Sequence, residues 1–348
     1  GHILLEPTST NLITYSEELD SESNNFPKAI VTLSNTISPD GTLSGLKINE
    51  TTGNSQHYAG SYVASVVDDG TIYTVSFYVK KGTYDTVTVF TSSNRISAVL
   101  NIRFSTESTS LSGADSVSGS NFMEDAGNGW YRVGFSATAH TTGGVSLYLP
   151  PKDLNTYVGD ISRYTEYWGM QIEALPYATS YIPTLTGSTV TREAETLTGS
   201  GNSTLINSTE GVLYAEIAAL ADGGDTRAIT IYSAANNRIT LSLHSTTNRV
   251  QFYIAMNGYV NTVDLDATDI SQTNMNKIAC KFKANDYALW INGVEKDTNT
   301  TQSNTVQSGT LNSLNFDING SNNFYGNVKC VAVFKEALSD TELENLTS

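Results

Sequence analysis

Polar and aromatic side chains on the alternating stretches of the first half are the best candidates for binding chemistry. The stretch 95–104 alternates apolar and polar residues with a period of two, as a half-buried β-strand does. Its polar face carries amide and guanidinium groups, from Arg95, Asn101 and Arg103. By the same parity, neighbouring stretches expose the rings of Tyr78, Tyr148 and Tyr167. Aromatic faces pack on the apolar side of a pyranose and polar groups bond its hydroxyls, so these residues form a candidate ligand-binding platform for a sugar.

The same residue types are also ordinary on the outer face of any β-sandwich, so a purely structural role for them stays open. Trp290 is a further binding candidate, because it is out of phase with Leu289 and Ile291 and is therefore expected to be exposed. Trp130 and Trp168 alternate in phase with apolar neighbours, so we expect both in the core.

Bond-cleaving chemistry has little support in the sequence. Hydrolysis of a glycosidic bond needs two carboxylates that face each other across it, and no strand carries acids in the spacing Glu-x-Asp-x-x-Glu. The nearest approach is Asp264, Asp266 and Asp269, at the end of a strand. There is no nucleophile elbow, Walker loop or HExxH motif, and the 4 histidines are scattered. We therefore predict that the protein is not an enzyme.

The amino-acid composition argues against nucleic acid and membranes as partners of this protein. Of 348 residues, 16% are charged, and 19 basic against 35 acidic residues give a net charge of −16. Without a basic block the chain cannot neutralise a phosphate backbone, so nucleic acid is not expected as a partner. No apolar run approaches the ~18 residues of a membrane-spanning helix, so no membrane insertion is expected. Abundant Ser, Thr, Asn, Gly and Tyr favour strands, tight turns and a surface of neutral hydrogen-bonding groups.

Short alternating strands, separated by Gly, Asn, Asp and Ser, predict an all-β protein of two tandem antiparallel β-sandwiches. In the first half the clear strands are 73–79, 95–104, 130–137, 145–149 and 167–172. In the second half they are 212–217, 228–232, 239–243, 250–255, 261–265, 278–283, 287–291, 314–318 and 328–334. The stretch 184–203 has no sustained apolar face. We therefore predict domains at 1–188 and 204–348, joined by a linker at 189–203.

Local signals mark one hairpin, one helix and two thiols. Asn292-Gly293 predicts a two-residue hairpin turn with positive φ at both positions. Ser339 and Glu342 have the spacing of a capping box before a short C-terminal helix. Cys280 and Cys330 each alternate with apolar neighbours, so both are expected as buried free thiols, with a disulfide between neighbouring strands as the alternative.

Motifs in the first half follow one another in a recognisable order: NLITYSEELDS at 11–21, PDGT at 39–42, NGWYRV at 128–133 and WGMQIEALPYATSYIPT at 168–184, followed by GSTVTRE. With the opening LLEPTSTNLITYSE they resemble a module that is widespread in bacteriophage tail fibre and tailspike proteins. The resemblance covers about residues 4–192. It implies a jelly roll similar to carbohydrate-binding modules.

The second half is similar to laminin G and concanavalin A-like sandwiches over roughly residues 204–348. The likeness rests on the hairpin ALWINGVEKDT and the closing segment FYGNVKCVAVFKEALSDTELENL. Jelly rolls and laminin G-like domains often carry a structural calcium ion held by carboxylates and carbonyls. The resemblance therefore makes calcium a candidate cofactor, with ligands sought among Asp222, Asp225, Asp264 and Asp266.

These observations together predict a non-catalytic, glycan-binding portion of a phage tail fibre or similar adhesin. Its partner would be a bacterial cell-surface polysaccharide, and its place the virion tail or another extracellular location. The tail-fibre resemblance implies a homo-oligomer such as a trimer, although the sequence contains no trimerisation coil. Two alternatives stay open: an accessory carbohydrate-binding region of a secreted polysaccharide-degrading enzyme, and a structural spacer of the virion without a ligand.

Overall fold

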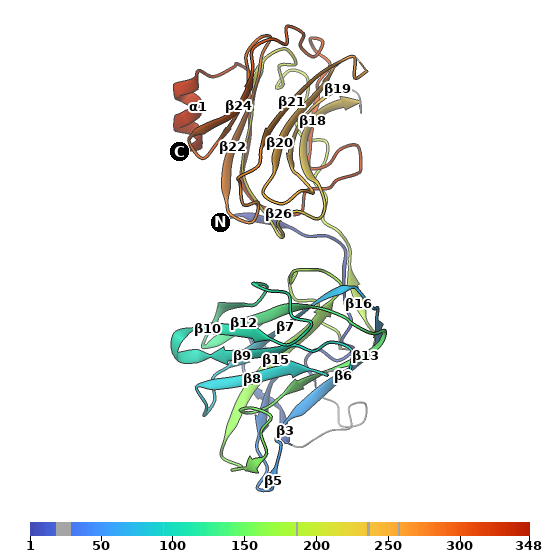
Figure 1. The fold of residues 1–348 in the computed structure, drawn as a ribbon, viewed down its shortest axis with the longest axis vertical. Helices are drawn as coiled ribbons and strands as arrows, with labels where there is room; N and C mark the ends of the chain where they lie inside the picture. The colour runs from blue at the N-terminus through green and yellow to red at the C-terminus, as the bar shows by residue number, and fades with distance from the viewer. Residues whose placement is uncertain (19–28, 93, 186, 235–236, 257) are drawn as a thin grey trace. The chain divides into compact units, whose positions relative to one another are not determined.

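The computed structural model describes residues 1–18, 29–92, 94–185, 187–234, 237–256 and 258–348, so residues 19–21 of the first motif lie outside the described residues (Figure 1). The described chain is built from β-strands with one α-helix near its C-terminus. This agrees with the predicted all-β class. Within the described ranges, no helix has the length and apolar character needed to span a membrane.

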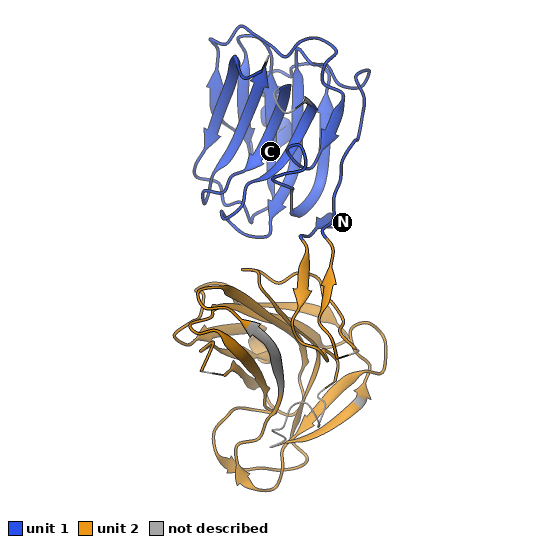
Figure 2. Cartoon of the chain, turned by 90° about the vertical axis from the view of Figure 1, so that its right-hand side faces the viewer, with its two compact units in different colours: residues 1–7, 194–348 blue, residues 8–193 orange. Residues whose placement is uncertain are grey.

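The chain forms two compact units, and the sequence of one unit interrupts the sequence of the other (Figure 2). Residues 8–193 form the inserted unit, and residues 1–7 together with 194–348 form the split unit. The boundary at 193/194 falls within the predicted linker. The grouping of residues 1–7 with the C-terminal part was not foreseen, because strand β1 (Ile3–Leu5) is too short for its periodicity to be recognised.

The inserted unit contains a six-stranded antiparallel sheet in the order β11-β12-β7-β15-β4-β3 and a five-stranded one in the order β10-β9-β8-β13-β6. The strands are β3 (Ile30–Thr36), β4 (Gly45–Asn49), β6 (Ala59–Val67), β7 (Ile72–Lys80), β8 (Thr86–Thr91), β9 (Val99–Arg103), β10 (Ser108–Ser112), β11 (Phe122–Gly127), β12 (Trp130–Thr138), β13 (Gly143–Leu149) and β15 (Tyr164–Glu173). Minor pairs join β2 (Ser9–Asn11) to β16 (Val190–Arg192) and β5 (Asn54–Ser55) to β14 (Tyr157–Val158), and a 3-10 turn spans Phe104–Thr106. Alternate residues of the two large sheets bury a common core.

A β-bulge in β15 decides which face its large side chains occupy. The register of β15 against β7 shifts between Trp168 and Gln171, where Gly169 has a φ of 60°. Because the bulge reverses the alternation, Tyr167 and Met170 both enter the core. The prediction that Tyr167 is exposed is therefore wrong. Trp168 is buried as predicted, but on the outer face of the sheet, where Tyr181 packs on it with ring centroids 4.7 Å apart.

The split unit is the second sandwich. Its six-stranded sheet has the order β1-β26-β17-β22-β23-β24 and its five-stranded sheet the order β21-β20-β19-β18-β25. The strands are β17 (Gly211–Ala219), β18 (Arg227–Ala234), β19 (Asn237–Leu243), β20 (Val250–Met256), β21 (Asn261–Ala267), β22 (Asn276–Phe282), β23 (Tyr287–Ile291), β24 (Val294–Asn299), β25 (Ser313–Asn315) and β26 (Gly326–Phe334). Every strand predicted in this half is present, although β25 ends three residues earlier than expected.

The predicted hairpin and helix cap of the split unit are confirmed. Asn292 and Gly293 have φ values of 50° and 80° between β23 and β24. Helix α1 (Asp340–Thr347) begins with a capping box, in which the Ser339 amide donates to the Glu342 carboxylate at 2.8 Å. The cap fixes where the helix starts and thus which of its residues meet the sheet.

Cys280 and Cys330 are both free thiols, and only Cys280 is buried. Burial raises the pKa of the Cys280 thiol. The prediction of burial is wrong for Cys330, which is exposed on β26. The register of β26 against β17 shifts between Cys330 and Val328, so Val328 faces the core whereas Cys330 falls out of phase with it.

Leu5 tests whether β1 belongs to the split unit. It is 4% exposed within that core, whereas Ile3 is 58% exposed. We expect Leu5→Ala to lower the free energy of unfolding of residues 194–348 by about 2 kcal/mol, because a buried leucine leaves a cavity. Hydrogen exchange with peptide resolution measures the effect, and Ile3→Ala is the control with little expected change. Faster exchange in residues 8–193 alone would contradict the assignment.

Gly169→Ala tests the bulge. A positive φ costs an L-residue about 1 kcal/mol, and a Cβ at Gly169 would lie 3.0 Å from Cδ2 of Tyr78. We therefore expect a loss of about 2 kcal/mol in urea unfolding. Gly70→Ala is the matched control, because Gly70 has a φ of 78° with open space around its Cβ position. Equal losses in both variants would show that contact with Tyr78 is harmless.

Candidate functional site

Two aromatic rings stand side by side on the outer face of the five-stranded sheet of the inserted unit. In β8, Val87 and Val89 point into the core, which turns Phe90 outward. In β13, Leu147 and Leu149 point inward and turn Tyr148 outward. Tyr148 is opposite Phe90 in the strand register. Their rings stack with centroids 4.7 Å apart and planes 11° apart, a favourable cross-strand contact.

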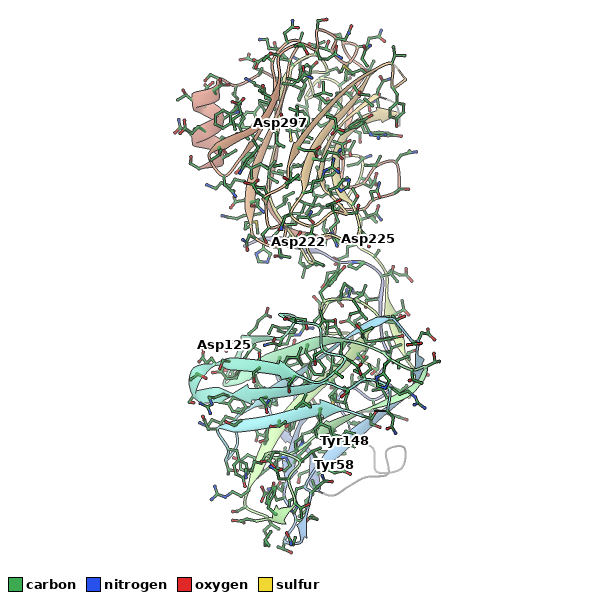
Figure 3. The ribbon with its side chains drawn as sticks, viewed as in Figure 1. Tyr58, Asp125, Tyr148, Asp222, Asp225 and Asp297 are labelled. Carbon is green, nitrogen blue, oxygen red and sulfur yellow. The ribbon has the colours of Figure 1, made fainter. Side chains whose placement is uncertain are left out.

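Tyr58 completes the aromatic group. Its ring meets that of Tyr148 edge to face, with centroids 5.1 Å apart, and Figure 3 labels both tyrosines on this part of the unit. Tyr58 itself is 8% exposed. Tyr148 is thus held between Phe90 and Tyr58, so its orientation is fixed before any ligand arrives.

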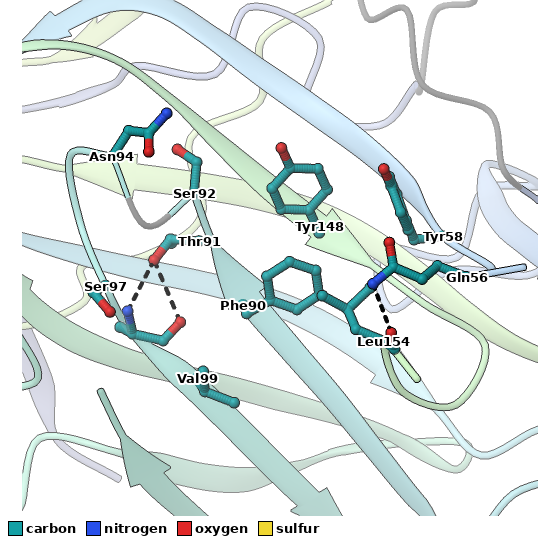
Figure 4. Close-up of a pocket in the computed structure, with 11 residues that line it drawn as sticks. Gln56, Tyr58, Phe90, Thr91, Ser92, Asn94, Ser97, Val99, Tyr148 and Leu154 are labelled. Carbon is teal, nitrogen blue, oxygen red and sulfur yellow. Dashed lines mark hydrogen bonds between the residues drawn. The ribbon is translucent and has the colours of Figure 1, made fainter. Parts of the chain in front are cut away.

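The aromatic group forms one wall of a hollow with a volume of about 400 Å³ (Figure 4). The lining residues are Gln56, Tyr58, Phe90, Thr91, Ser92, Asn94, Ser97, Ala98, Val99, Tyr148 and Leu154. Apolar rings and aliphatic groups alternate here with hydroxyls and amides. This combination suits a ligand that has both an apolar face and several hydroxyls.

Hydrogen bonds hold the polar rim in place. The Ser92 hydroxyl accepts a bond from the Ser146 amide at 3.0 Å, which leaves its own O–H able to donate. Gln56 donates from Nε2 to the Leu154 carbonyl at 2.8 Å. The Thr91 hydroxyl donates to the Ile96 carbonyl at 2.8 Å, and this bond connects the last residue of β8 to the far side of the loop that follows it. The rim is therefore preorganised for binding.

The hollow contains no acid or base for catalysis among its lining residues. General acid–base or nucleophilic hydrolysis of a sugar requires carboxylates or an equivalent pair at the bond to be broken. The lining instead offers aromatic faces, hydroxyls and amides.

The other predicted platform residues near this sheet do not line the hollow. Asn101 and Arg103 belong to β9, whereas Arg95 lies in the loop before it, so the strand predicted at 95–104 begins only at Val99. The Asn101 amide oxygen accepts a bond from the Thr88 hydroxyl at 2.8 Å on the same outer face. Arg103 is exposed at the end of β9. Arg95 donates from Nη1 to the Asn94 carbonyl at 2.8 Å, so it supports the rim from outside. Of the predicted platform, only Tyr148 reaches the hollow itself.

Tyr78 and Tyr167 belong elsewhere. Tyr78 lies on the six-stranded sheet, where Trp168 packs at 5.1 Å between ring centroids and burial raises the pKa of its phenol. Tyr167 is fully buried, and its hydroxyl donates to the Pro150 carbonyl at 2.7 Å. Neither ring shares a surface with Tyr148, so the six-residue platform predicted from parity is not assembled.

Trp290 is buried on the outer face of its sheet. The Trp290 side chain points away from the main core, as its position in the alternation indicated. Helix α1 nevertheless covers it, because Leu343 of the helix packs in one cluster with Trp290 and Tyr214. The side chain is 8% exposed. The prediction of exposure is wrong because the pattern of a single strand does not reveal what a distant helix covers.

Sequence reasoning missed most of the lining. Phe90 was detectable, since it occupies the polar phase of the alternating stretch 86–91. Tyr58 precedes β6 and carries no periodic signal. The rim residues Ser92, Asn94 and Ser97 lie in a loop whose path depends on tertiary contacts.

The carboxylates of Asp222, Asp264 and Asp266, three of the four acids predicted as calcium ligands, accept hydrogen bonds from protein donors (Figure 3 labels Asp222 and Asp225). Asp222 accepts the Asn248 amide at 2.7 Å. Asp264 accepts Gln251 Nε2 at 2.8 Å. Asp225 lies in the same loop as Asp222, and its backbone carbonyl accepts a bond from Arg227. In the described part of the chain, no three His, Cys, Asp or Glu side chains are grouped as metal ligands. These residues do not make a carboxylate cage, and calcium binding stays a prediction.

Asp266 forms a two-pronged ion pair with Arg249. The distances are 2.8 Å from Nε to Oδ1 and 2.9 Å from Nη2 to Oδ2. These bonds raise the pKa of the guanidinium further above its usual range. Both carboxylate oxygens are thereby engaged, in a geometry typical of strong Arg–carboxylate pairs.

Comparisons with known proteins agree with this architecture. Residues 201–344 match a laminin G-type family described as the concanavalin A-like lectin/glucanases superfamily. This confirms the fold expected of the second half. A comparison with curated protein sequences finds no match.

Three solved structures show distant likenesses to this chain. The sialidase module CBM40 of Ruminococcus gnavus is 16% identical with a TM-score of 0.36, over 44% of this chain and 97% of that one. Domain 4 of the arabinanase AbnA from Geobacillus stearothermophilus, solved with arabinotriose, is 17% identical with a TM-score of 0.35, over 42% and 70%. Domains LG4-5 of mouse laminin alpha1 are 10% identical with a TM-score of 0.29, over 83% and 90%. These scores are too low to assign a ligand to this chain.

Asp266→Asn tests the role of its carboxylate. We expect a loss of about 1 kcal/mol in the free energy of unfolding, because a partly exposed bidentate pair is broken. The loss should be equal in chelator and in millimolar calcium. Asp264→Asn, whose partner is a neutral amide, should lose less. A loss that occurs only when calcium is present would instead make Asp266 a metal ligand.

Proposed function

We propose that the protein is a non-catalytic carbohydrate-binding protein that holds a sugar in the hollow of the inserted unit. The observation that carries the proposal is the stacked pair Phe90 and Tyr148, turned outward beside a rim of neutral hydroxyls and amides. Aromatic faces supply the apolar contact, and Ser92, Asn94 and Gln56 supply hydrogen bonds that orient the ligand.

The family that the second sandwich matches is compatible with sugar binding but does not by itself support it. The description of the matched family names both lectins, which bind sugars, and glucanases, which cleave them. The match alone therefore favours neither binding nor cleavage. The absence of acids and histidines among the described residues that line the hollow supports binding. We therefore expect no newly formed reducing ends when the protein is incubated with bacterial polysaccharides.

For the biological setting, we propose the receptor-binding part of a phage tail fibre or similar adhesin that recognises a bacterial surface polysaccharide. The ordered motifs of residues 4–192 support this setting. Contacts in one open hollow are individually weak, so several copies in a homo-oligomer such as a trimer would bind a repeating polymer by avidity. The protein would then be located in the virion tail or, as a secreted protein, outside the cell.

The alternatives differ in what they bind. An accessory region of a polysaccharide-degrading enzyme would bind a polysaccharide that its catalytic partner cleaves, whereas a virion spacer would bind no glycan. Binding to whole bacterial cells, compared with binding to purified plant and bacterial polysaccharides, separates these possibilities.

Tyr148→Ala tests the hollow. Removing the central ring should weaken glycan binding at least about tenfold, a change of about 1.4 kcal/mol, in calorimetry with a glycan selected on an array. Tyr164→Ala is the control, because Tyr164 lies outside the hollow with its ring beneath Lys47. Both variants should melt as cooperatively as the unaltered protein. Unchanged affinity in Tyr148→Ala would remove the hollow as the binding site.

A further inference from the structure

The hollow is lined without charge. Its polar groups are hydroxyls, amides and backbone, and none of the described lining residues is an acid, a lysine, an arginine or a histidine. Such groups pair well with sugar hydroxyls, which donate and accept in the same way. They offer no counter-ion to a carboxylate, a sulfate or an ammonium group on a ligand.

Two charged side chains close to the lining make contacts of their own. Asp115 accepts the Ser97 amide beneath the rim and pairs with His140 Nδ1 at 2.6 Å. Arg95 bonds to the Asn94 carbonyl.

On the other side of the hollow, Lys152 precedes Leu154 by two residues. Its ammonium group lies 3.6 Å from the Asp153 carboxylate and 5.0 Å from the centroid of the Tyr157 ring. This cation is therefore balanced by a neighbouring acid and faces an aromatic ring. An anion in the hollow would have to compete with Asp153 for this cation.

From this arrangement we infer that the hollow selects neutral sugars and rejects acidic ones, such as uronic or sialic acids. The inference rests on the proposed function and names its ligand class. A ligand carboxylate in the hollow would lose water without gaining a charged partner, which is costly. The net charge of −16 repels it further.

A glycan array with matched pairs tests the inference on the full chain. Each neutral oligosaccharide is printed beside its counterpart that bears a uronic or sialic acid, for example lactose beside sialyllactose. We expect neutral members to bind, acidic counterparts to bind about tenfold or more weakly, and neutral binding to be unchanged between low and high salt, because no ion pair forms. Tyr148→Ala should abolish the neutral signal.

A charge added at the rim gives the complementary test. Asn94→Lys places an ammonium group at an exposed position of the lining, so it should raise binding of acidic counterparts several-fold and make it salt-sensitive. Asn312→Lys adds the same charge to an exposed position of the split unit and should change nothing.

The possible failures are distinguishable. Preferential, salt-sensitive binding of acidic glycans by the unaltered protein would overturn the inference and leave glycan binding intact. An absence of binding to every glycan, with cooperative melting retained, would overturn the proposed function and the inference with it.

Discussion

Cross-strand register is the constraint on which the candidate site depends. Phe90 and Tyr148 come from strands far apart in the sequence, and they stack because β8 and β13 place them directly opposite each other. Since side chains alternate between the two faces, a slip of one residue would send one ring into the core and leave the other alone. The valines and leucines that alternate with these rings prevent that slip, so the packed core positions the two rings of the candidate site.

Parts of the fold in which apolar and polar residues alternate regularly along a strand were predictable from the sequence. Parts in which a bulge or a distant element interrupts or overrides that alternation were not. The strands of the split unit, the Asn292-Gly293 turn and the helix cap all depend on near neighbours. Tyr167 was misplaced because one glycine bulge reverses the phase of β15, and Trp290 because a helix from the chain's end covers it. Tyr148 followed correctly from parity, whereas Tyr58 depends on tertiary contacts that no short sequence window contains.

The two sandwiches use their outer sheet faces differently. In the split unit, helix α1 and Trp290 bury part of one outer face in a second small core, which stabilises the sheet and removes its aromatic ring from solvent. In the inserted unit the stacked rings stay beside an open hollow. The same residue types thus serve stability in one unit and are available for recognition in the other, and the difference lies in what covers them.

The insertion of residues 8–193 between β1 and the remainder of its sandwich has a consequence for biosynthesis. Domains generally form as they leave the ribosome, N-terminal parts first. Strand β1 emerges before the inserted unit but pairs with β26, so it must wait until the inserted unit and the strands up to β26 have been translated. Meanwhile residues 8–193 contain all the strands of their own sandwich and can fold on the ribosome. Pairing of β2 with β16 holds the two ends of the inserted unit together. Once the inserted unit has folded, the loop that must close before β1 can pair with β26 is therefore effectively shorter.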